Sequence, residues 1–324
     1  MRGEVSTRRS ETFSNDCRRI SSRRKERLRN RRRFLQAGLG ATACFASGAF
    51  SSATTLTAWG ADAAPIKPVK KIPLALQVYS LREYAAKDFA GTMKKIAEMG
   101  YEGVEFAGYY GKSAKEVRKA LDDAGLKAIS THLGVPQLLD GAFEATVEFE
   151  KTLGNSRLIV AGGLSESCKT DAGNQMTAYL FNEIAAKAAK VGMQIGFHAH
   201  FNDFANINGK TAWEVFFNRT RKDVIAQMDV GNCLSGGGDP YAEIEKQPGR
   251  GQLLHVKAHG KPGTKGAVVA SPEDSVDWAK MFELCETKAG VEWYIVEQED
   301  FRDGSDALEA CAEAFENLKK MGKA

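Results

Sequence analysis

The sequence predicts an α/β protein in which eight parallel strands, each followed by a helix, close into a single (β/α)₈ TIM barrel. From residue 72 onward, short apolar runs alternate with amphipathic stretches, which is typical of a parallel sheet joined by crossover helices. Eight such alternations fit within about 250 residues, the usual size of this barrel. A doubly wound sheet is the alternative, but no G-x-G-x-x-G follows the first strand.

The predicted strands are short runs rich in Val, Ile, Leu and Phe, and several begin soon after a glycine. They span residues 74–79, 103–106, 127–132, 157–161, 194–198, 224–229, 253–257 and 293–297. Runs of this length and composition, spaced by helical patterns, are expected to be buried on both faces.

The predicted helices repeat their apolar residues at helical spacing. They span residues 89–99, 114–124, 142–153, 175–191, 212–219, 278–289 and 305–321, with a weaker crossover near 240–245. In 175–191, for example, Leu180, Ile184 and Ala188 form one apolar stripe. Glycines such as Gly125 and Gly154 stand where a helix is expected to end.

The first 63 residues are predicted to lie outside the barrel. Residues 1–33 hold 13 Lys and Arg but only 4 Asp and Glu, and they contain too little apolar surface to fold. The segment Arg-Arg-Arg-Phe-Leu at 31–35, followed by a weakly apolar stretch at 37–58, resembles a twin-arginine export signal. A basic disordered tail with a membrane-surface helix is the alternative.

The resemblance to an export signal implies a location and a partner. Ala61 and Ala63 are the small residues that a signal peptidase requires, so the catalytic domain is expected to span residues 64–324. The twin-arginine export machinery, which carries folded proteins, would then deliver it to the bacterial periplasm or beyond.

The charge distribution weighs against a nucleic-acid partner. The formal net charge is +4, yet outside residues 1–33 the chain has 32 basic and 37 acidic side chains. This part of the chain therefore has no overall positive electrostatic field that would attract the phosphate backbone of a nucleic acid. No uninterrupted run of about 20 apolar residues occurs either, so a multi-span membrane protein is excluded. The sequence leaves open whether the barrel forms a homo-oligomer.

Polar side chains end most of the predicted strands, which is where the active site of a barrel is built. They are Gln77, Tyr79, Glu105, His132, His198, His200, Asp229, His255, Lys257 and Glu297, with His259 just beyond. Side chains at i and i+2 share a face, so several imidazoles and carboxylates are expected to converge. A single strand histidine is more often a core residue, but a cluster indicates a divalent-metal site.

Six segments resemble the successive strand motifs of the sugar phosphate isomerase/epimerase family of xylose-isomerase-like barrels. They read LALQVYSLRE, GYEGVEFAG, IGFHAHFNDF, MDVGNCLSGGGDP, LLHVKAHG and YIVEQED. The resemblance implies that Asp229, His255 and Glu297 are metal ligands. His198 stands where the ketose epimerases of the family have a glutamate ligand, and His200 is the alternative from the same strand.

The resemblance further implies a sugar substrate and a Mn²⁺, Co²⁺ or Zn²⁺ cofactor that supports an enediolate intermediate. Glu297 or Glu105 would act as the base, and Lys257 or His132 would hold oxygens or move protons. The expected substrate contacts are Gln77, Tyr79, His200 and His259. Isomerisation or epimerisation is favoured, and a lyase or dehydratase that eliminates a β-substituent from a 3-keto-glycoside or inosose remains open.

Other functions fit the sequence less well. A DNA-repair endonuclease on this barrel would carry more metal ligands than five histidines and the nearby carboxylates provide. A non-catalytic sugar-binding barrel would keep aromatic residues such as Tyr79, Tyr109, Tyr110 and Trp213 for stacking. The Gly- and Lys-rich segment 259–266 lacks the residue order of a P-loop, so it is interpreted as a lid over the barrel mouth.

Overall fold

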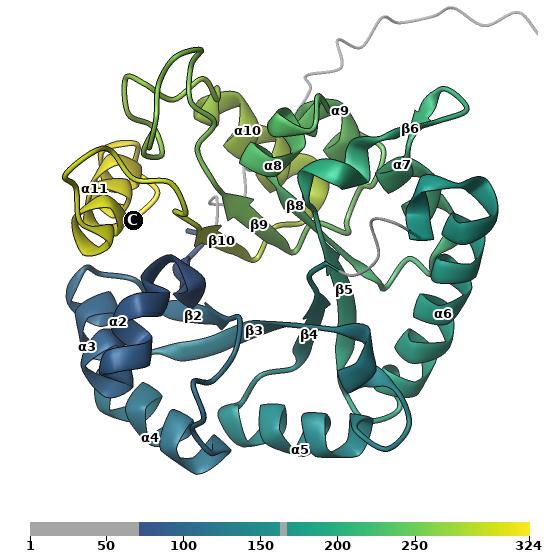
Figure 1. Cartoon of the computed structure of the whole chain (residues 1–324), viewed down its shortest axis with the longest axis horizontal. Helices are drawn as coiled ribbons and strands as arrows, with labels where there is room; N and C mark the ends of the chain where they lie inside the picture. Colours follow the sequence, from purple (N-terminus) through teal and green to yellow (C-terminus); the bar gives the residue numbers. More distant parts are fainter. Residues whose placement is uncertain (1–70, 163–166) are drawn as a thin grey trace, which may run out of the picture. The chain divides into compact units, whose positions relative to one another are not determined.

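The computed structural model describes residues 71–162 and 167–324; the predicted export signal lies outside these residues. Eight parallel strands close into a barrel in the order β1-β10-β9-β8-β5-β4-β3-β2 (Figure 1), which confirms the predicted fold class. The barrel strands are β1 (Leu74–Gln77), β2 (Gly103–Phe106), β3 (Lys127–Leu133), β4 (Arg157–Val160), β5 (Gln194–His198), β8 (Ile225–Asp229), β9 (Leu253–Val256) and β10 (Trp293–Val296).

Helices surround the barrel (Figure 1). They are α2 (Arg82–Lys87), α3 (Phe89–Glu98), α4 (Ala114–Ala124), α5 (Phe143–Leu153), α6 (Asp171–Ala189), α7 (Ala212–Arg219), α8 (Val230–Ser235), α9 (Pro240–Glu245), α10 (Trp278–Leu284) and α11 (Ala307–Lys320). A small antiparallel hairpin, β6 (Asn206–Ile207) with β7 (Lys210–Thr211), precedes α7. No helix in the described part of the chain is long and apolar enough to cross a membrane.

Three differences between the predicted and observed boundaries have a clear local cause, and the other boundaries agree to within two residues. The first strand ends at Gln77, because Val78–Leu81 form a 3₁₀ turn whose Tyr79 N–H donates to the Gln77 side chain. Helix α6 begins earlier than predicted, at Asp171, where the Thr170 hydroxyl caps it. The last predicted helix before β10 is α10 followed by a π-helical turn, Cys285–Ala289.

The barrel interior begins with an apolar layer. Six buried side chains from different strands form it: Ala75, Ile129, Ile159, Ile225, Leu253 and Ile295. On β5 the corresponding position is Gly196, where a Cβ atom would lie 2.5 Å from Cδ1 of Ile159 and 2.9 Å from Cβ of Ile225. The isoleucines from both neighbouring strands therefore fill the space that a β5 side chain would occupy.

Two residues further along most of the strands, the inward positions become polar. Gln77, Glu105, Gln227, His255 and Glu297 follow the apolar layer on β1, β2, β8, β9 and just after β10, and each is at most 5% exposed. The larger apolar cluster lies between the strands and the helices and excludes these polar groups. The polar interior is therefore confined to the carboxyl-terminal end of the barrel.

Candidate active site

A cavity of about 340 Å³ opens at the carboxyl-terminal ends of the strands. Six of the predicted site residues line it: Tyr79, His132, His198, His200, Lys257 and Glu297. A space of this size, with several polar groups facing it, is suited to a small polar ligand. The position agrees with the general rule that barrel enzymes bind their substrates at this end.

Four predicted metal ligands come together at the base of this cavity. His198, Asp229, His255 and Glu297 each offer a donor atom, and these atoms all lie within 4.8 Å of one another. They come from β5, β8, β9 and the end of β10, which are consecutive in the barrel. Ligand atoms about 2.1 Å from a shared ion lie at most about 4.2 Å apart, so small side-chain rotations would complete the site. His200 is not part of this group.

The surroundings of Asp229 fit a cation. Its Oδ1 accepts the backbone N–H of Asn232 at 2.7 Å, whereas its fully buried Oδ2 has no hydrogen-bond partner among the described residues. Nε2 of His198 lies 3.9 Å from Oδ2, and Nδ1 of His255 lies 3.8 Å from it. Burial raises the pKa of Asp229 because nothing nearby fully compensates its charge. A divalent ion at this point would supply that compensation.

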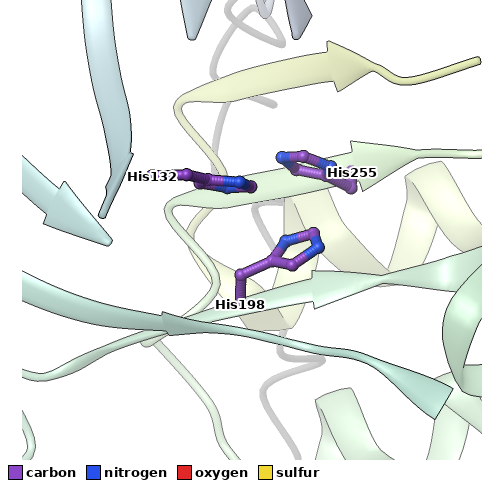
Figure 2. A group of neighbouring side chains, drawn as sticks. All are labelled: His132, His198 and His255. Atoms are coloured by element: carbon purple, nitrogen blue, oxygen red, sulfur yellow. The ribbon is translucent and has the colours of Figure 1, made fainter. Parts of the chain in front are cut away.

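The imidazole rings of His132, His198 and His255 lie close together (Figure 2). The ring centroids of His198 are 4.5 Å from His132 and 4.4 Å from His255. Burial, followed by the neighbouring imidazoles, holds the pKa of His198 well below its ordinary value, so this ring is neutral. Burial alone would lower the pKa of His255, but Glu105 and Glu297 raise it to about 10.

Glu105 lies beneath the cavity and organises the histidines. Its carboxylate is fully buried and accepts from Gln77 at 2.9 Å, from Ser130 at 2.5 Å and from Gln227 at 2.6 Å. Nε2 of His255 lies 2.5 Å from the same carboxylate. Burial alone would raise the pKa of Glu105, but His132 and His255 keep it well below its ordinary value. Glu105 therefore orients the site from below and does not line the cavity.

Gln227 is a site residue that the sequence reasoning missed. Its Nε2 donates to Glu105, which can only accept, so its Oε1 must face Nε2 of His132 at 2.8 Å and Nδ1 of His198 at 3.0 Å. An amide oxygen only accepts, which makes Nδ1 of His198 a donor. The neutral ring then keeps its lone pair on Nε2, the atom nearest Asp229. The sequence did contain a signal for this role, because Gln227 precedes Asp229 by two residues and therefore lies on the same face of the strand.

Lys257 supplies the positive charge of the cavity wall. Its Nζ lies 3.9 Å from Oδ2 of Asp229 and 3.7 Å from Oε2 of Glu297, and it forms an ion pair with Glu299. Burial alone would lower the pKa of Lys257, but these three carboxylates raise it. Burial also opposes ionisation of Glu297, yet His255 and Lys257 hold the pKa of Glu297 well below its usual range. Glu299 lines the cavity as well; the sequence places it at the end of the last strand with Glu297, but no role was predicted for it.

The structure separates two predicted substrate contacts from the cavity. Gln77 is fully buried and donates to Glu105, so its role is to hold that carboxylate. His259 lies further along the loop after β9, where its Nδ1 is 2.9 Å from Oγ of Ser275, and it is not in the cavity wall. Trp213, proposed for stacking in a sugar-binding barrel, is 1% exposed and packs on Phe197 in the core.

The fold and site define the class to which this protein belongs. Residues 93–321 match the xylose isomerase-like TIM barrel family, and the chain is a member of it. The solved structures similar to the chain include a sugar phosphate isomerase/epimerase from Parabacteroides distasonis ATCC 8503, at 22% identity and a TM-score of 0.67. That match covers 76% of this chain and 96% of the other.

Two enzymes of known activity share the fold at lower identity. The 3-keto-D-glucoside 4-epimerase of E. coli is 14% identical, with a TM-score of 0.53 over 77% of this chain and 99% of its own. A D-psicose 3-epimerase is 13% identical, with a TM-score of 0.55 over 77% and 98% of the two chains. No curated protein sequence is similar to this chain. Likenesses at these identities establish the fold, and the activity is argued from the site.

Proposed function

We propose that this protein is a divalent-metal-dependent enzyme that isomerises or epimerises a keto-sugar through an enediolate. The observation that carries the proposal is the group of His198, Asp229, His255 and Glu297 at the base of a sugar-sized cavity. The oxygen and nitrogen donors of this group suit Mn²⁺, Co²⁺ or Zn²⁺. Sugar epimerases among the similar structures support a sugar as the substrate class.

A divalent ion held by the four residues would polarise the sugar carbonyl and make the neighbouring C–H acidic. Glu297 is ionised and lines the cavity, so its carboxylate is placed to take the proton from that carbon. Lys257 stays protonated beside it and donates hydrogen bonds to the sugar oxygens. His132 also lines the cavity, and we assign it proton transfer between the sugar oxygens.

Elimination of a β-substituent is the second candidate. The fifth strand offers an imidazole, His198, where a two-base epimerase of this family would have a carboxylate. Among the described residues, the carboxylates in the cavity wall are Glu297 and Glu299, and both follow the same strand, β10. After proton removal, Lys257 could protonate a departing hydroxyl or alkoxide instead of a carbon being reprotonated.

Metal content and turnover of the full-length protein test the proposal. The protein is loaded separately with Mn²⁺, Co²⁺ and Zn²⁺, dialysed, and analysed by elemental mass spectrometry. We expect about one ion per chain. Each form is then incubated with 3-keto-glycosides, inososes and free ketoses in D₂O and followed by NMR. Deuterium incorporation without bond loss supports the isomerase, and release of water or an aglycone supports the lyase. Binding of a sugar without isomerisation or elimination would identify a non-catalytic sugar-binding barrel.

Two variants separate metal binding from stabilisation of the sugar oxygens. Asp229→Ala is expected to lose both the ion and turnover, because it removes a ligand. Lys257→Met is expected to retain the ion but lose about 10²–10³-fold in kcat, the range for a donor to a developing negative charge. Lys319→Met on α11, which removes an exposed lysine paired with Glu316, is the matched control. Full metal occupancy and unchanged turnover in Asp229→Ala would refute the proposal.

A further inference from the structure

A second cavity of about 190 Å³ adjoins the first. It lies between the loop that follows β9, residues 257–267, and the loop that follows β10, residues 297–300. Lys257, Glu297 and Glu299 line both cavities. The ion pair of Lys257 with Glu299 therefore stands at the boundary between them.

The walls of the second cavity are tied together at several points. Nε2 of Gln298 donates to the carbonyl of Ala267 at 3.0 Å and to that of Asp300 at 2.6 Å, which joins the two loops. Gly266 packs so closely on the second loop that a Cβ atom would lie 2.2 Å from N of Arg302. Lys265 adds an ion pair with Asp303 at 2.8 Å. The cavity is thus a built part of the barrel mouth, and the segment predicted as a lid forms its wall.

The charges in the wall favour an uncharged ligand. Lys257 and Lys265 are each paired with a carboxylate, Glu299 and Asp303 respectively. With Glu297 on the proposed ion, the carboxylates of Glu299 and Asp300 balance these two cations in the wall. A phosphate would therefore meet no unpaired positive side chain among the residues of this wall.

The hydrogen-bonding groups favour hydroxyl donors. Gln298 is 3% exposed, and its Oε1 accepts no hydrogen bond from any described residue. Its amide orientation is set by the two carbonyls that its Nε2 contacts, so Oε1 is an unpaired acceptor that is itself shielded behind the wall. The carboxylates of Glu299 and Asp300, which line the cavity and can only accept, match the hydroxyl donors of a neutral sugar.

We propose that the second cavity binds a second sugar unit of the substrate while the reacting unit occupies the first cavity. The bond between the units would cross the Lys257–Glu299 pair. The substrate is therefore an uncharged glycoside of at least two units, and not a sugar phosphate or a free monosaccharide. The assignment of the reacting unit rests on the function proposed above, whereas the binding preference is independent of turnover.

Calorimetric titration of the full-length protein tests the subsite without any reaction. The probes are trehalose, sucrose, maltose and cellobiose, compared with glucose and glucose 6-phosphate. We expect at least one disaccharide to bind about tenfold or more tightly than glucose, and glucose 6-phosphate to bind no more tightly than glucose. Equal binding of glucose and all four disaccharides, or tighter binding of the phosphate, would overturn the proposal.

A matched pair of variants tests which cavity is responsible for the preference for a disaccharide over glucose. Ala258 lines only the second cavity and Ala107 only the first. Ala258→Leu is expected to abolish the disaccharide preference, whereas Ala107→Leu should weaken glucose and disaccharide binding by similar factors. Thr264→Trp, on the exposed rim of the second cavity, replaces Ala258→Leu if that variant does not fold. If the preference for a disaccharide over glucose survives narrowing of the second cavity, the subsite proposal is contradicted, even if the enzyme turns over a keto-sugar. If that preference is lost on narrowing but no keto-sugar is turned over, only the proposed catalytic function is contradicted.

Discussion

Asp229 shows how one buried atom connects stability with function. Its Oδ2 is shielded from water and has no hydrogen-bond partner among the described residues. Burying a carboxylate in this way destabilises the folded protein unless a cation or donor compensates it. If the site binds a divalent ion as proposed, the energetic cost of burying Asp229 in the metal-free protein would be recovered on metal binding.

We predict that Asp229→Asn changes stability in opposite directions with and without metal. In EDTA the neutral amide should stabilise the protein by about 1 kcal/mol, which raises Tm by about 2–4 °C for a protein of this size. With Mn²⁺ at about 100 times its Kd, the wild type should gain about 2.7 kcal/mol and the variant much less. Thermal melts under both conditions measure this. A lower Tm of the variant than of the wild type in EDTA would show that other groups of the metal-free protein already compensate the negative charge on Oδ2.

Gln227 contacts the candidate metal site through hydrogen bonds with its neighbours. Because Glu105 fixes the amide, Oε1 accepts from both His132 and His198. A metal-binding histidine is commonly held by a second hydrogen bond of this kind, which sets the ring orientation and tautomer. Gln227 is thus a positioning residue that lies in the layer below the cavity.

Gln227→Leu should weaken metal binding about 10–100-fold, the range found for partners of ligating histidines. Ser130→Ala is the control, since Ser130 also donates to Glu105 but contacts neither His132 nor His198. Affinities are measured by competition with a chelator, and ¹⁵N NMR of the imidazoles reports the tautomer of His198. Equal losses in both variants would mean that general disturbance of Glu105, and not the tautomer, controls affinity.

At the scale of elements, the apolar layer determines how closely β5 approaches its neighbours. Gly196 faces Ile159 of β4 and Ile225 of β8, and these side chains meet where its own would lie. His198, two residues later, takes its position from this packing. The packing of the barrel core and the position of the predicted metal ligand His198 are therefore linked along one strand.

Gly196→Ala should destabilise the protein by about 1–3 kcal/mol, the usual cost of overpacking a core. Gly134→Ala is the control, because a Cβ atom there meets its nearest neighbour at an ordinary 3.4 Å and the residue has φ of −93°. Urea denaturation compares the two. A midpoint for Gly196→Ala within the error of the control would show that the isoleucines can move apart.

The loop between β9 and α10 depends on one carboxylate. Asp274 accepts the backbone N–H groups of His259 at 3.2 Å and Ala270 at 2.9 Å, and the indole N–H of Trp278 at 2.6 Å. Asp274 is buried, so these bonds are protected from competition with water. The arrangement supports the loop that forms the wall of the second cavity.

Asp274→Asn is expected to destabilise the protein by about 1–3 kcal/mol, since one oxygen that accepts two donors becomes an amide donor. Amide hydrogen exchange across residues 258–276 should accelerate. Asp277→Asn, an exposed helix cap in the same loop, should leave exchange outside the first turn of α10 unchanged. Unaltered exchange in Asp274→Asn would show that the loop is held by its other contacts.

At the scale of the whole molecule, closure of the barrel makes the site possible. Strands β5, β8, β9 and β10 are adjacent, although His198 and Glu297 are far apart in the sequence. Their parallel direction brings all their carboxyl ends to one side. The predicted role of the N-terminal segment is separate from the site, since it would determine where in the cell the folded barrel is delivered.

We propose that residues 1–63 direct export, on the basis of the paired arginines before Phe34 and Leu35. Replacing Arg31 and Arg32 together by Lys in a bacterium with the twin-arginine machinery should retain the full-length chain in the cytoplasm. Cell fractionation and mass spectrometry of the N-terminus measure the location and the cleavage site. The control replaces Arg8 and Arg9 by Lys, which removes the same groups outside the motif. Equal export of both variants would contradict the proposal.

The strands and most helices could be predicted because their signals are local. Strands β2 and β5 and helices α4 and α7 have the bounds expected from the pattern of apolar residues. The predicted ligands also meet, because strand ends are easy to locate once the barrel is recognised. The sequence could not show that Gln77 and Glu105 lie below the cavity and do not line it. The depth of a side chain within the barrel depends on the relative register of neighbouring strands.

By itself, the order of residues determined the (β/α)₈ architecture and the choice of His198, Asp229, His255 and Glu297 as a group. Periodicity and strand-end position are properties of short segments, so they can be recognised without coordinates. Only the tertiary structure decided that Gln227 sets the tautomer of His198, that His259 lies outside the cavity wall, and that a second cavity adjoins the first. These features depend on distances between side chains from different strands and loops, which closure of the barrel alone establishes.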